Sequence, residues 1–216
     1  MQIFLILVAG YLLGSIPTAV WLGKWFGKID IREHGSGNAG ATNALRVLGR
    51  KWGLVVLALD ISKGLAAVLL LVPLLTFGRP HDPGLLSVLA GTAAIVGHIF
   101  PVTIGFRGGK GVGTSAGVMF ALAPLVALTA LVIWVAVVSV TRYVSLGSML
   151  AALSVTPLLI LQGILLDAAP QRPLLVFALL LAVGVLASHR ANIGRLLRGS
   201  ENRLSLTSSQ TKGETR

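Results

Sequence analysis

Six long apolar runs dominate this sequence and restrict the folds open to it. They cover residues 3–21, 53–76, 85–104, 112–140, 144–166 and 173–187. A helix needs roughly 20 apolar residues to cross the hydrocarbon core of a bilayer. Of the 216 residues, 55% are hydrophobic and only 12% are charged. The sequence therefore predicts an all-α integral membrane protein whose membrane helices use most of the chain.

Lysines and arginines indicate how the runs are oriented. The segment 24–51 holds six basic residues against two acids, residues 107–110 are basic, and the chain is strongly basic from Arg190 onward. Because basic loops stay on the cytoplasmic side, we expect these three segments there. The connections 77–84 and 167–172 each balance one arginine against one aspartate, so we expect them outside.

The run 112–140 breaks the simple count of one crossing per run. If every run crossed once, the basic C-terminal segment would lie outside. The run has 29 residues, too many for one span and too few for two full ones, and Pro124 interrupts it. We predict two short helices that meet near Pro124. The result is about seven transmembrane helices, five full spans plus this short pair, with the N-terminus outside and the C-terminus cytoplasmic.

Composition excludes several classes of site. There is no cysteine, and the four histidines lack metal-ligand spacing, so we expect no metal and no cofactor. The net charge of +11 lies in segments that flank the membrane and carry no interleaved aromatics, so it indicates topology and phosphate groups rather than nucleic acid. We predict one membrane domain, residues 1–203, and a disordered polar tail, residues 204–216.

Three glycine-rich, basic stretches interrupt the apolar chain, and we call them the first motif (35–46), the second motif (105–115) and the third motif (188–201). Such sequence is dispensable as membrane scaffold, so it points to an anion site. The first motif predicts a helix that begins at a cap near Asn38 and aligns Thr42 and Arg46 with it. Such a helix offers an anion its N-terminus and a guanidinium. An interfacial helix that only sets topology is the alternative.

The second motif predicts a phosphate-binding loop. Five glycines surround two basic residues and precede two hydroxyls: Gly105, Gly108, Gly109, Gly111 and Gly113, then Arg107 and Lys110, then Thr114 and Ser115. Glycines let backbone N–H groups approach phosphate oxygens. The order of residues does not match a Walker A loop. A flexible turn that carries positive-inside anchors is the alternative.

Other polar residues are expected to complete the site. In the third motif His189, Asn192 and Arg195 would form one polar stripe if the last span continued through them. Glu201 would pair with an arginine of that motif. Within the apolar runs we expect Asp60 and Lys63 to pair, because an isolated charge in a membrane is costly. His98, which could be no more than a solvated interfacial histidine, is assigned to structural support with them.

In order and in topology the three motifs resemble the PlsY family, the bacterial membrane glycerol-3-phosphate acyltransferases that use acyl phosphate. The resemblance also covers residues 14–17, 60–64 and 97–101. It implies acyl transfer from acyl phosphate to the 1-hydroxyl of sn-glycerol 3-phosphate, which gives 1-acyl-glycerol 3-phosphate and inorganic phosphate. It further implies that the first motif supplies an important serine and arginine, which match Ser36 and Arg46. The loop that binds glycerol phosphate matches Gly108 to Thr114. The histidine, asparagine and structural glutamate of the third motif match His189, Asn192 and Glu201. Arg107 and Gly113 stand where the family commonly has lysine and alanine.

We assign roles on this basis. Expected to be catalytic are Ser36, Arg46, Lys110, His189 and Asn192. Expected to bind substrate phosphates are Asn38, Thr42, Asn43, Arg107, Gly108, Gly109, Gly111, Gly113, Thr114, Ser115, Ser145 and Ser148. Structural support is expected from Asp60, Lys63, His98 and Glu201. The general base is either His189 or a phosphate oxygen of the substrate. Ser36 is disfavoured as a covalent nucleophile because no dedicated base is marked beside it.

Two alternative activities fit the sequence less well. A transporter or channel for a phosphorylated small anion would also place glycines and arginines beside broken helices. Against it, all motifs lie on one face and no internal repeat is evident. A thioester donor is disfavoured because no histidine is followed by an aspartate five positions later. The expected setting is the bacterial inner membrane, with the site on the cytoplasmic side, the bilayer and the two substrates as partners, and coupling to the enzyme that makes acyl phosphate.

Overall fold

The computed structural model describes residues 1–77 and 81–204, and within these ranges every regular element is a helix. They are α1 (Gln2–Gly14), α2 (Thr18–Leu22), η1 (Gly23–Gly27), η2 (Ile31–Glu33), α3 (Ala41–Leu48), α4 (Arg50–Ala66), η3 (Ala67–Leu71), α5 (Val72–Leu75), α6 (Pro83–Ile99), η4 (Val102–Ile104), α7 (Val112–Leu122), α8 (Pro124–Thr141), α9 (Val144–Leu165), α10 (Arg172–Ser188) and α11 (Arg190–Leu197). The predicted all-α architecture is confirmed.

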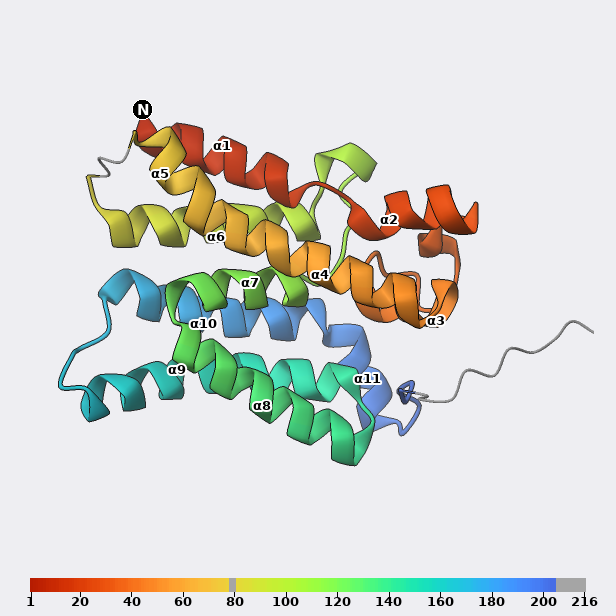
Figure 1. Cartoon of the computed structure of the whole chain (residues 1–216). Helices are drawn as coiled ribbons and strands as arrows, with labels where there is room; N and C mark the ends of the chain where they lie inside the picture. Colours follow the sequence, from red (N-terminus) through yellow and green to blue (C-terminus); the bar gives the residue numbers. More distant parts are fainter. Residues whose placement is uncertain (78–80, 205–216) are drawn as a thin grey trace, which may run out of the picture.

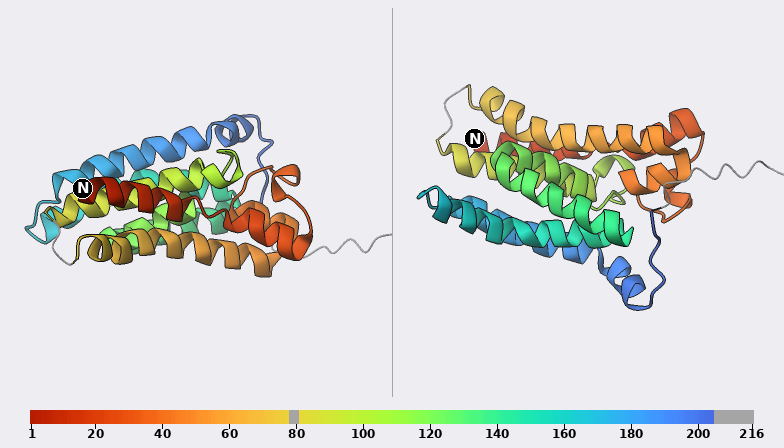
Figure 2. Two further views of the ribbon diagram at one scale, coloured as in Figure 1. Left: turned by 90° about the horizontal axis from the view of Figure 1, so that it is seen from above. Right: turned by 60° about the horizontal axis from the view of Figure 1, so that its bottom comes forward.

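The long helices run side by side, and the short helices α3 and α11 lie at one end of the bundle, opposite the N-terminus (Figures 1 and 2). Helix α1 packs on α6, α4 on α7, and α8 on α9. Glycines set two of these contacts, because a Cβ on Gly14 would collide with the Ala94 carbonyl and one on Gly117 with the Ile61 carbonyl. Small residues are how membrane helices come this close.

Five stretches within the described residues are long and apolar enough to cross a membrane: Gln2–Gly27, Arg50–Leu75, Pro83–Ile104, Pro124–Thr141 and Val144–Leu165. Helices α10 and α11 together form a sixth candidate, bent by 60°. The multi-span membrane protein expected from the sequence is thus confirmed in outline.

The break at Pro124 is also confirmed, because α7 ends at Leu122 and α8 begins at Pro124 itself. Proline suits the first position of a helix, where its missing N–H is not needed. The two helices are unequal. Helix α7 has 11 residues, whereas α8 has 18 and is long enough to cross alone, so the prediction of a short second helix was wrong.

The first apolar run is not one continuous helix. Residues 15–17 separate α1 from α2, and the break leaves carbonyl groups without helical partners. Thr103 Oγ1 donates to the Ser15 carbonyl at 2.6 Å, and Lys63 Nζ donates to the Ile16 carbonyl at 3.2 Å. Backbone at membrane depth must find such partners inside the protein, so these two side chains stabilise the break.

The C-terminal end of the described chain returns to the bundle. The Leu204 N–H donates to the Arg142 carbonyl at 2.8 Å, between α8 and α9. Apart from Leu204, the predicted disordered tail, residues 204–216, lies outside the described residues. The return of this segment carries Glu201 back against α9 and α11.

Candidate active site

Charged residues of the three motifs meet at one place. Lys110 of the second motif donates a hydrogen bond to Asn192 Oδ1 of the third motif. Three other charged side chains lie close enough to shift the pKa of Lys110: Arg46 of the first motif, and Arg195 and Glu201 of the third. Residues from three distant parts of the chain therefore form a single cationic cluster at the α3 and α11 end of the bundle.

Glu201 holds this cluster together and is itself buried. Its Oε1 accepts hydrogen bonds from Ser145 Oγ at 2.8 Å and Asn192 Nδ2 at 2.6 Å, and its Oε2 accepts from Arg195 Nε at 2.7 Å. Burial alone would raise the pKa of the Glu201 carboxyl, but these hydrogen bonds outweigh burial and lower the pKa. Glu201 is thus a carboxylate with three donors, which agrees with structural support. Ser145, expected to bind phosphate, contacts Glu201 instead.

Lys110 has an unusual electrostatic environment for a lysine. Burial lowers its pKa most, the charge of Glu201 raises it, and the charges of Arg195 and Arg46 lower it, which together leave the pKa at about 8. A partly desolvated ammonium beside two guanidinium groups favours an anion, because a bound phosphate would relieve the repulsion among the three cations. The arrangement predicts a phosphate-binding centre.

His189 is buried at the bend between α10 and α11. Its Nδ1 lies 2.8 Å from the Val185 carbonyl, a contact that a proton on Nδ1 satisfies. The other ring nitrogen, Nε2, is then an acceptor. The bend interrupts the helix at His189, so the last span does not continue through the third motif, which was the condition for the predicted three-residue stripe. Only Asn192 and Arg195 share α11, and both bind Glu201.

The helix of the first motif begins later than expected. Helix α3 starts at Ala41 with Gly40 as its N-cap, so Asn38 lies in the preceding loop and does not align with Thr42 and Arg46. Thr42 and Arg46 do share one face of α3, and Arg46 is exposed. The predicted alignment of all three side chains was wrong because the helix cap is Gly40 rather than Asn38.

Asn43 orders the loop before α3. Its amide donates to the carbonyls of Ile31 at 2.9 Å and His34 at 3.0 Å, and its Oδ1 accepts from the Ser36 backbone N–H at 2.8 Å. Both amide hydrogens are used, and the side chain is buried. The structure thus makes Asn43 a support for the loop rather than the substrate ligand predicted, while it leaves Ser36 exposed.

The first part of the second motif is a folded turn, not an open phosphate cradle. The N–H groups of Gly108 and Gly109 donate to the carbonyls of Ile99 and His98, each at 3.1 Å. A Cβ at either glycine would collide with His98. These two N–H groups are therefore not free for phosphate as predicted, and the two glycines serve close packing instead.

The second part of the motif is the N-terminus of α7. Gly111 caps this helix with a φ of 82°, and the Ser115 N–H makes the first intrahelical bond, to the Gly111 carbonyl at 2.7 Å. The N–H groups of residues 112–114, which include Gly113, therefore have no intrahelical acceptor. They give Lys110 a neighbouring helix N-terminus, where anions are stabilised.

The remaining predicted phosphate ligands lie in different settings. The hydroxyls of Thr114 and Ser115 are buried without a hydrogen-bond partner among the described residues. Ser148 Oγ donates to the Val144 carbonyl at 2.9 Å and accepts from Trp134 Nε1, so it supports the α8–α9 contact instead of the predicted substrate. Arg107 is exposed and, with Arg32 and other residues, lines an open hollow of about 340 Å³.

The predicted pair of Asp60 and Lys63 is confirmed, with 2.9 Å between Asp60 Oδ1 and Lys63 Nζ. His98 Nδ1 lies 3.5 Å from the same oxygen, so His98 is buried support rather than a solvated residue. Sequence reasoning missed Thr18, whose Oγ1 donates to Asp60 Oδ1 at 2.7 Å. A hydroxyl directly after a proline within an apolar run was the available signal.

A link between the segments directly before the first two motifs was also missed. Arg32 is paired with Asp30 at 2.7 Å and donates to the Ile104 carbonyl at 2.9 Å, directly before the second motif. Hydrogen bonds from Arg32 outweigh burial and lower the pKa of the Asp30 carboxyl to about 2. In the sequence, the only indication of this contact was that Asp30 and Arg32 lie two positions apart in a basic segment.

Known proteins share this sequence and fold. A family model described as glycerol-3-phosphate acyltransferase matches residues 4–199. A glycerol-3-phosphate acyltransferase of Chlorobaculum tepidum is 43% identical over 224 residues, which cover 93% of this chain and 95% of its own. One from a Synechococcus species is 46% identical over 200 residues, which cover 93% and 94%.

A crystal structure of PlsY, an integral membrane glycerol 3-phosphate acyltransferase, in its glycerol 3-phosphate form matches with a TM-score of 0.83 and 37% identity over 95% of this chain and 96% of that one. The lysphosphatidic acid form matches with a TM-score of 0.81 and 36% identity over the same shares. The resemblance seen in the three motifs thus extends over nearly the whole sequence and the whole fold. The chain belongs to the glycerol-3-phosphate acyltransferase family.

Proposed function

We propose that this protein transfers a fatty acyl group from acyl phosphate to the 1-hydroxyl of sn-glycerol 3-phosphate. The products are 1-acyl-sn-glycerol 3-phosphate and inorganic phosphate, and the reaction would begin phospholipid synthesis. The observation that carries the proposal is the convergence of Lys110, Arg46 and Arg195 beside the N-terminus of α7. Both substrates carry a phosphate, and this cluster has the charge to hold them. Family membership supplies the reaction class.

In this proposal binding and orientation account for most of the catalysis. An acyl phosphate is already an activated mixed anhydride, so no covalent intermediate is needed. Lys110, Arg46 and the free N–H groups of α7 hold the phosphates. Asn192 keeps Lys110 in place through its own bond to Glu201. Arg107 and Thr42 are further candidates for phosphate contact, because both are at least partly accessible.

The reaction exchanges one acyl–oxygen bond for another. The oxygen of the 1-hydroxyl attacks the acyl carbonyl carbon, and the carbon–oxygen bond to phosphate breaks as inorganic phosphate leaves. The hydroxyl proton goes to an acceptor, either His189 Nε2 or an oxygen of a bound phosphate. A hydrogen-bond donor stabilises the negative charge on the carbonyl oxygen, and the exposed Ser36 hydroxyl is a candidate for this role.

The proposed setting follows from the distribution of charge. Residues 1–203 form one membrane domain with about seven transmembrane helices, the N-terminus outside and the C-terminus cytoplasmic. The basic segments that contain Arg46, Lys110 and Arg195 then lie on the cytoplasmic side of the bacterial inner membrane. This side suits a water-soluble acceptor made in the cytoplasm and an amphipathic donor delivered by the enzyme that makes acyl phosphate.

The test is phosphate release by the purified protein in lipid. We expect palmitoyl phosphate to release inorganic phosphate only when glycerol 3-phosphate is present, with formation of the lyso-lipid, and palmitoyl-CoA to give no product. If folded protein releases no phosphate, the acyltransferase proposal is wrong. Uptake of glycerol 3-phosphate into proteoliposomes would then test the anion transporter.

A further inference from the structure

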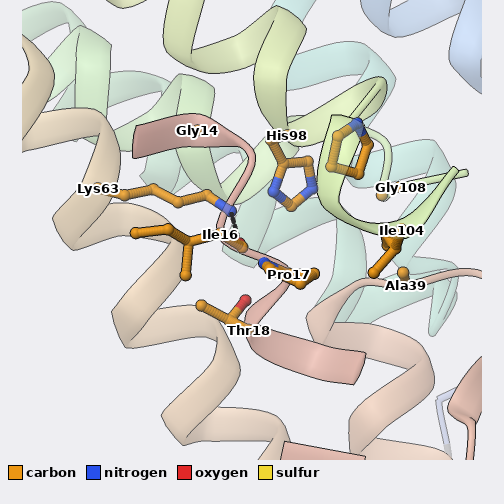
Figure 3. Close-up of a pocket in the computed structure, with 11 residues that line it drawn as sticks. Gly14, Ile16, Pro17, Thr18, Ala39, Lys63, His98, Ile104 and Gly108 are labelled. Carbon is orange, nitrogen blue, oxygen red and sulfur yellow. Dashed lines mark hydrogen bonds between the residues drawn. The ribbon is translucent and has the colours of Figure 1, made fainter. Parts of the chain in front are cut away.

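A buried charged cluster lies beside the proposed site, and no step of the reaction uses it. Asp60 Oδ1 accepts a hydrogen bond from Thr18 Oγ1 at 2.7 Å, lies 2.9 Å from Lys63 Nζ, and lies 3.5 Å from His98 Nδ1. The side chains of Asp60, Lys63 and His98 are 6% exposed or less. Figure 3 shows Thr18, Lys63 and His98 around the break between α1 and α2.

Such a cluster is costly to build. Charged groups lose their hydration when a membrane protein buries them, and a well-packed apolar core can replace a buried ion pair at little loss of stability. Stability alone is therefore a weak reason for Asp60 and Lys63 to be charged. The contacts that the cluster makes with the second motif offer a better one.

His98 supports the first half of the second motif. The Gly109 N–H donates to the His98 carbonyl at 3.1 Å, and a Cβ on Gly109 would collide with Nε2 of the His98 ring. The imidazole thus fills the space under Gly109, while its other nitrogen faces Asp60. The ring therefore packs directly against the backbone next to Lys110.

Asp60 supports the other side of Lys110. A Cβ on Gly113 would lie 3.1 Å from the Cβ of Asp60, so the first turn of α7 rests directly on this residue. Helices α4 and α7 stay in close contact beyond this point, because a Cβ on Gly64 would collide with the Thr114 carbonyl. Lys110 therefore lies between two supports, Gly109 on His98 and Gly113 on Asp60.

The cluster is also fixed to the N-terminal part of the chain. Lys63 Nζ donates to the Ile16 carbonyl at 3.2 Å, the bond drawn in Figure 3, and Thr18 follows the same break. Three elements, α2, α4 and α6, thus hold one carboxylate in place from three directions. The carboxylate is thus fixed beside the first turn of α7, directly after the loop that carries Lys110.

We propose that Asp60 and His98 are positioning residues for Lys110. They hold the backbone on both sides of it, so that its ammonium meets the phosphate of glycerol 3-phosphate. This inference rests on the proposed function, in which Lys110 binds that phosphate. A displacement of about 1 Å at a binding group costs up to about 100-fold in rate, so the expected effect is on substrate use as well as on stability.

The experiment measures KM for glycerol 3-phosphate and kcat by phosphate release, in the folded, monodisperse fraction of full-length variants in lipid. Asp60→Asn and His98→Ala are expected to raise KM about tenfold or more. His98→Asn should recover part of the loss, because its amide nitrogen can donate to Asp60 from near the place of Nδ1 but its side chain does not fill the space under Gly109. If either variant does not accumulate as folded protein, Thr18→Val replaces it, with a smaller rise in KM.

The matched control is Thr76→Val, which removes another buried hydroxyl, one bonded to the Val72 carbonyl near the opposite end of the bundle. It should lower the melting temperature without changing KM. If His98→Ala and His98→Asn both keep the wild-type KM and differ from the wild type only in a lower melting temperature, the positioning role is refuted. Failure of the proposed function looks different: either the wild type releases no phosphate, or Lys110→Met keeps its affinity for glycerol 3-phosphate.

Discussion

Two carboxylates in this protein are held in the same way but in opposite surroundings. Asp60 and Glu201 each accept hydrogen bonds or ion-pair contacts from three side chains, one of them a hydroxyl and one a cation. The cation beside Asp60 is Lys63, only 6% exposed, whereas Arg195 beside Glu201 is 31% exposed. One cluster is closed, and the other opens at the end of the bundle.

The balance of charge separates the two clusters further. Asp60 faces one lysine and one histidine. Glu201 faces Arg195, and Lys110 and Arg46 lie close by, so three cationic side chains surround one carboxylate. The closed cluster can satisfy its charges internally, but the open one has positive charge left for a ligand. Similar hydrogen bonding thus stabilises a fold in one place and presents a binding centre in the other.

Removing Lys110 should have the largest effect, because both clusters act on it. Lys110→Met is expected to lower kcat/KM for glycerol 3-phosphate by about 100-fold or more, through loss of a charge-assisted phosphate contact. Phosphate release with palmitoyl phosphate measures it. Lys28→Met, at an exposed lysine outside the cluster, is the control and should behave as wild type. Wild-type activity in Lys110→Met would contradict the view that both clusters act on Lys110.

Neutralising Glu201 should have the next largest effect and disturb the open cluster alone. Glu201→Gln keeps an acceptor for one donor but leaves Arg195 without its ion pair, and breaking such a pair typically costs about 3–5 kcal/mol when it is fully buried. Because Arg195 is partly exposed, we expect a smaller loss of stability, with kcat/KM about tenfold lower. Thermal unfolding and phosphate release measure the two effects. A fall in melting temperature with unchanged kcat/KM would mean that Glu201 stabilises the fold and does not affect catalysis.

The pH dependence should show which charges act on Lys110. With its pKa lowered to about 8, kcat/KM should fall as pH rises through that range, because the free enzyme loses a cation that binds phosphate. The charges that shift this pKa are those of Glu201, which raises it, and of Arg195 and Arg46, which lower it. In Glu201→Gln the fall should therefore begin at lower pH. A profile that is the same in both proteins would contradict this view of the open cluster.

The smallest expected effects distinguish two serines of α9. Ser145→Ala removes one of three donors to Glu201, and loss of a buried hydrogen bond to a charged group costs about 1.5–3 kcal/mol. Ser148→Ala removes a hydroxyl that bonds within α9 and to Trp134. We expect a several-fold lower kcat/KM for Ser145→Ala and a value within about twofold of wild type for Ser148→Ala. Equal losses in both would mean that both serines touch substrate.

Much of the fold could be predicted because it depends on local pattern. Apolar runs and proline positions located the candidate spans and the break before α8. The break at residues 15–17 was missed although Pro17 lies within it, and its side-chain partners could not be predicted because Lys63 and Thr103 are far away in the sequence. In the same way the start of α3 depends on Asn43, whose partners lie 7 to 12 positions earlier.

The site was predicted better by residue type than by role. Charge and glycine content brought the three motifs together correctly. They could not show that the N–H groups of Gly108 and Gly109 donate to carbonyls at the end of α6, or that Ser148 bonds to Trp134. Each of these assignments is decided by which group lies nearest in three dimensions. Confirmed pairs such as Asp60 with Lys63 were short-range, three residues apart on one helix.

The break between α1 and α2 also bears on the order of biosynthesis. The first apolar segment leaves the ribosome long before Lys63 and Thr103, the two residues that satisfy its open carbonyls. Until those residues have been made and inserted, the Ser15 and Ile16 carbonyls lack the side-chain donors that they have in the folded protein. The full set of hydrogen bonds at this break therefore forms only after Thr103, which follows the helix that ends at Ile99, has joined the bundle. Maturation of the amino-terminal part then comes late, although its synthesis comes first.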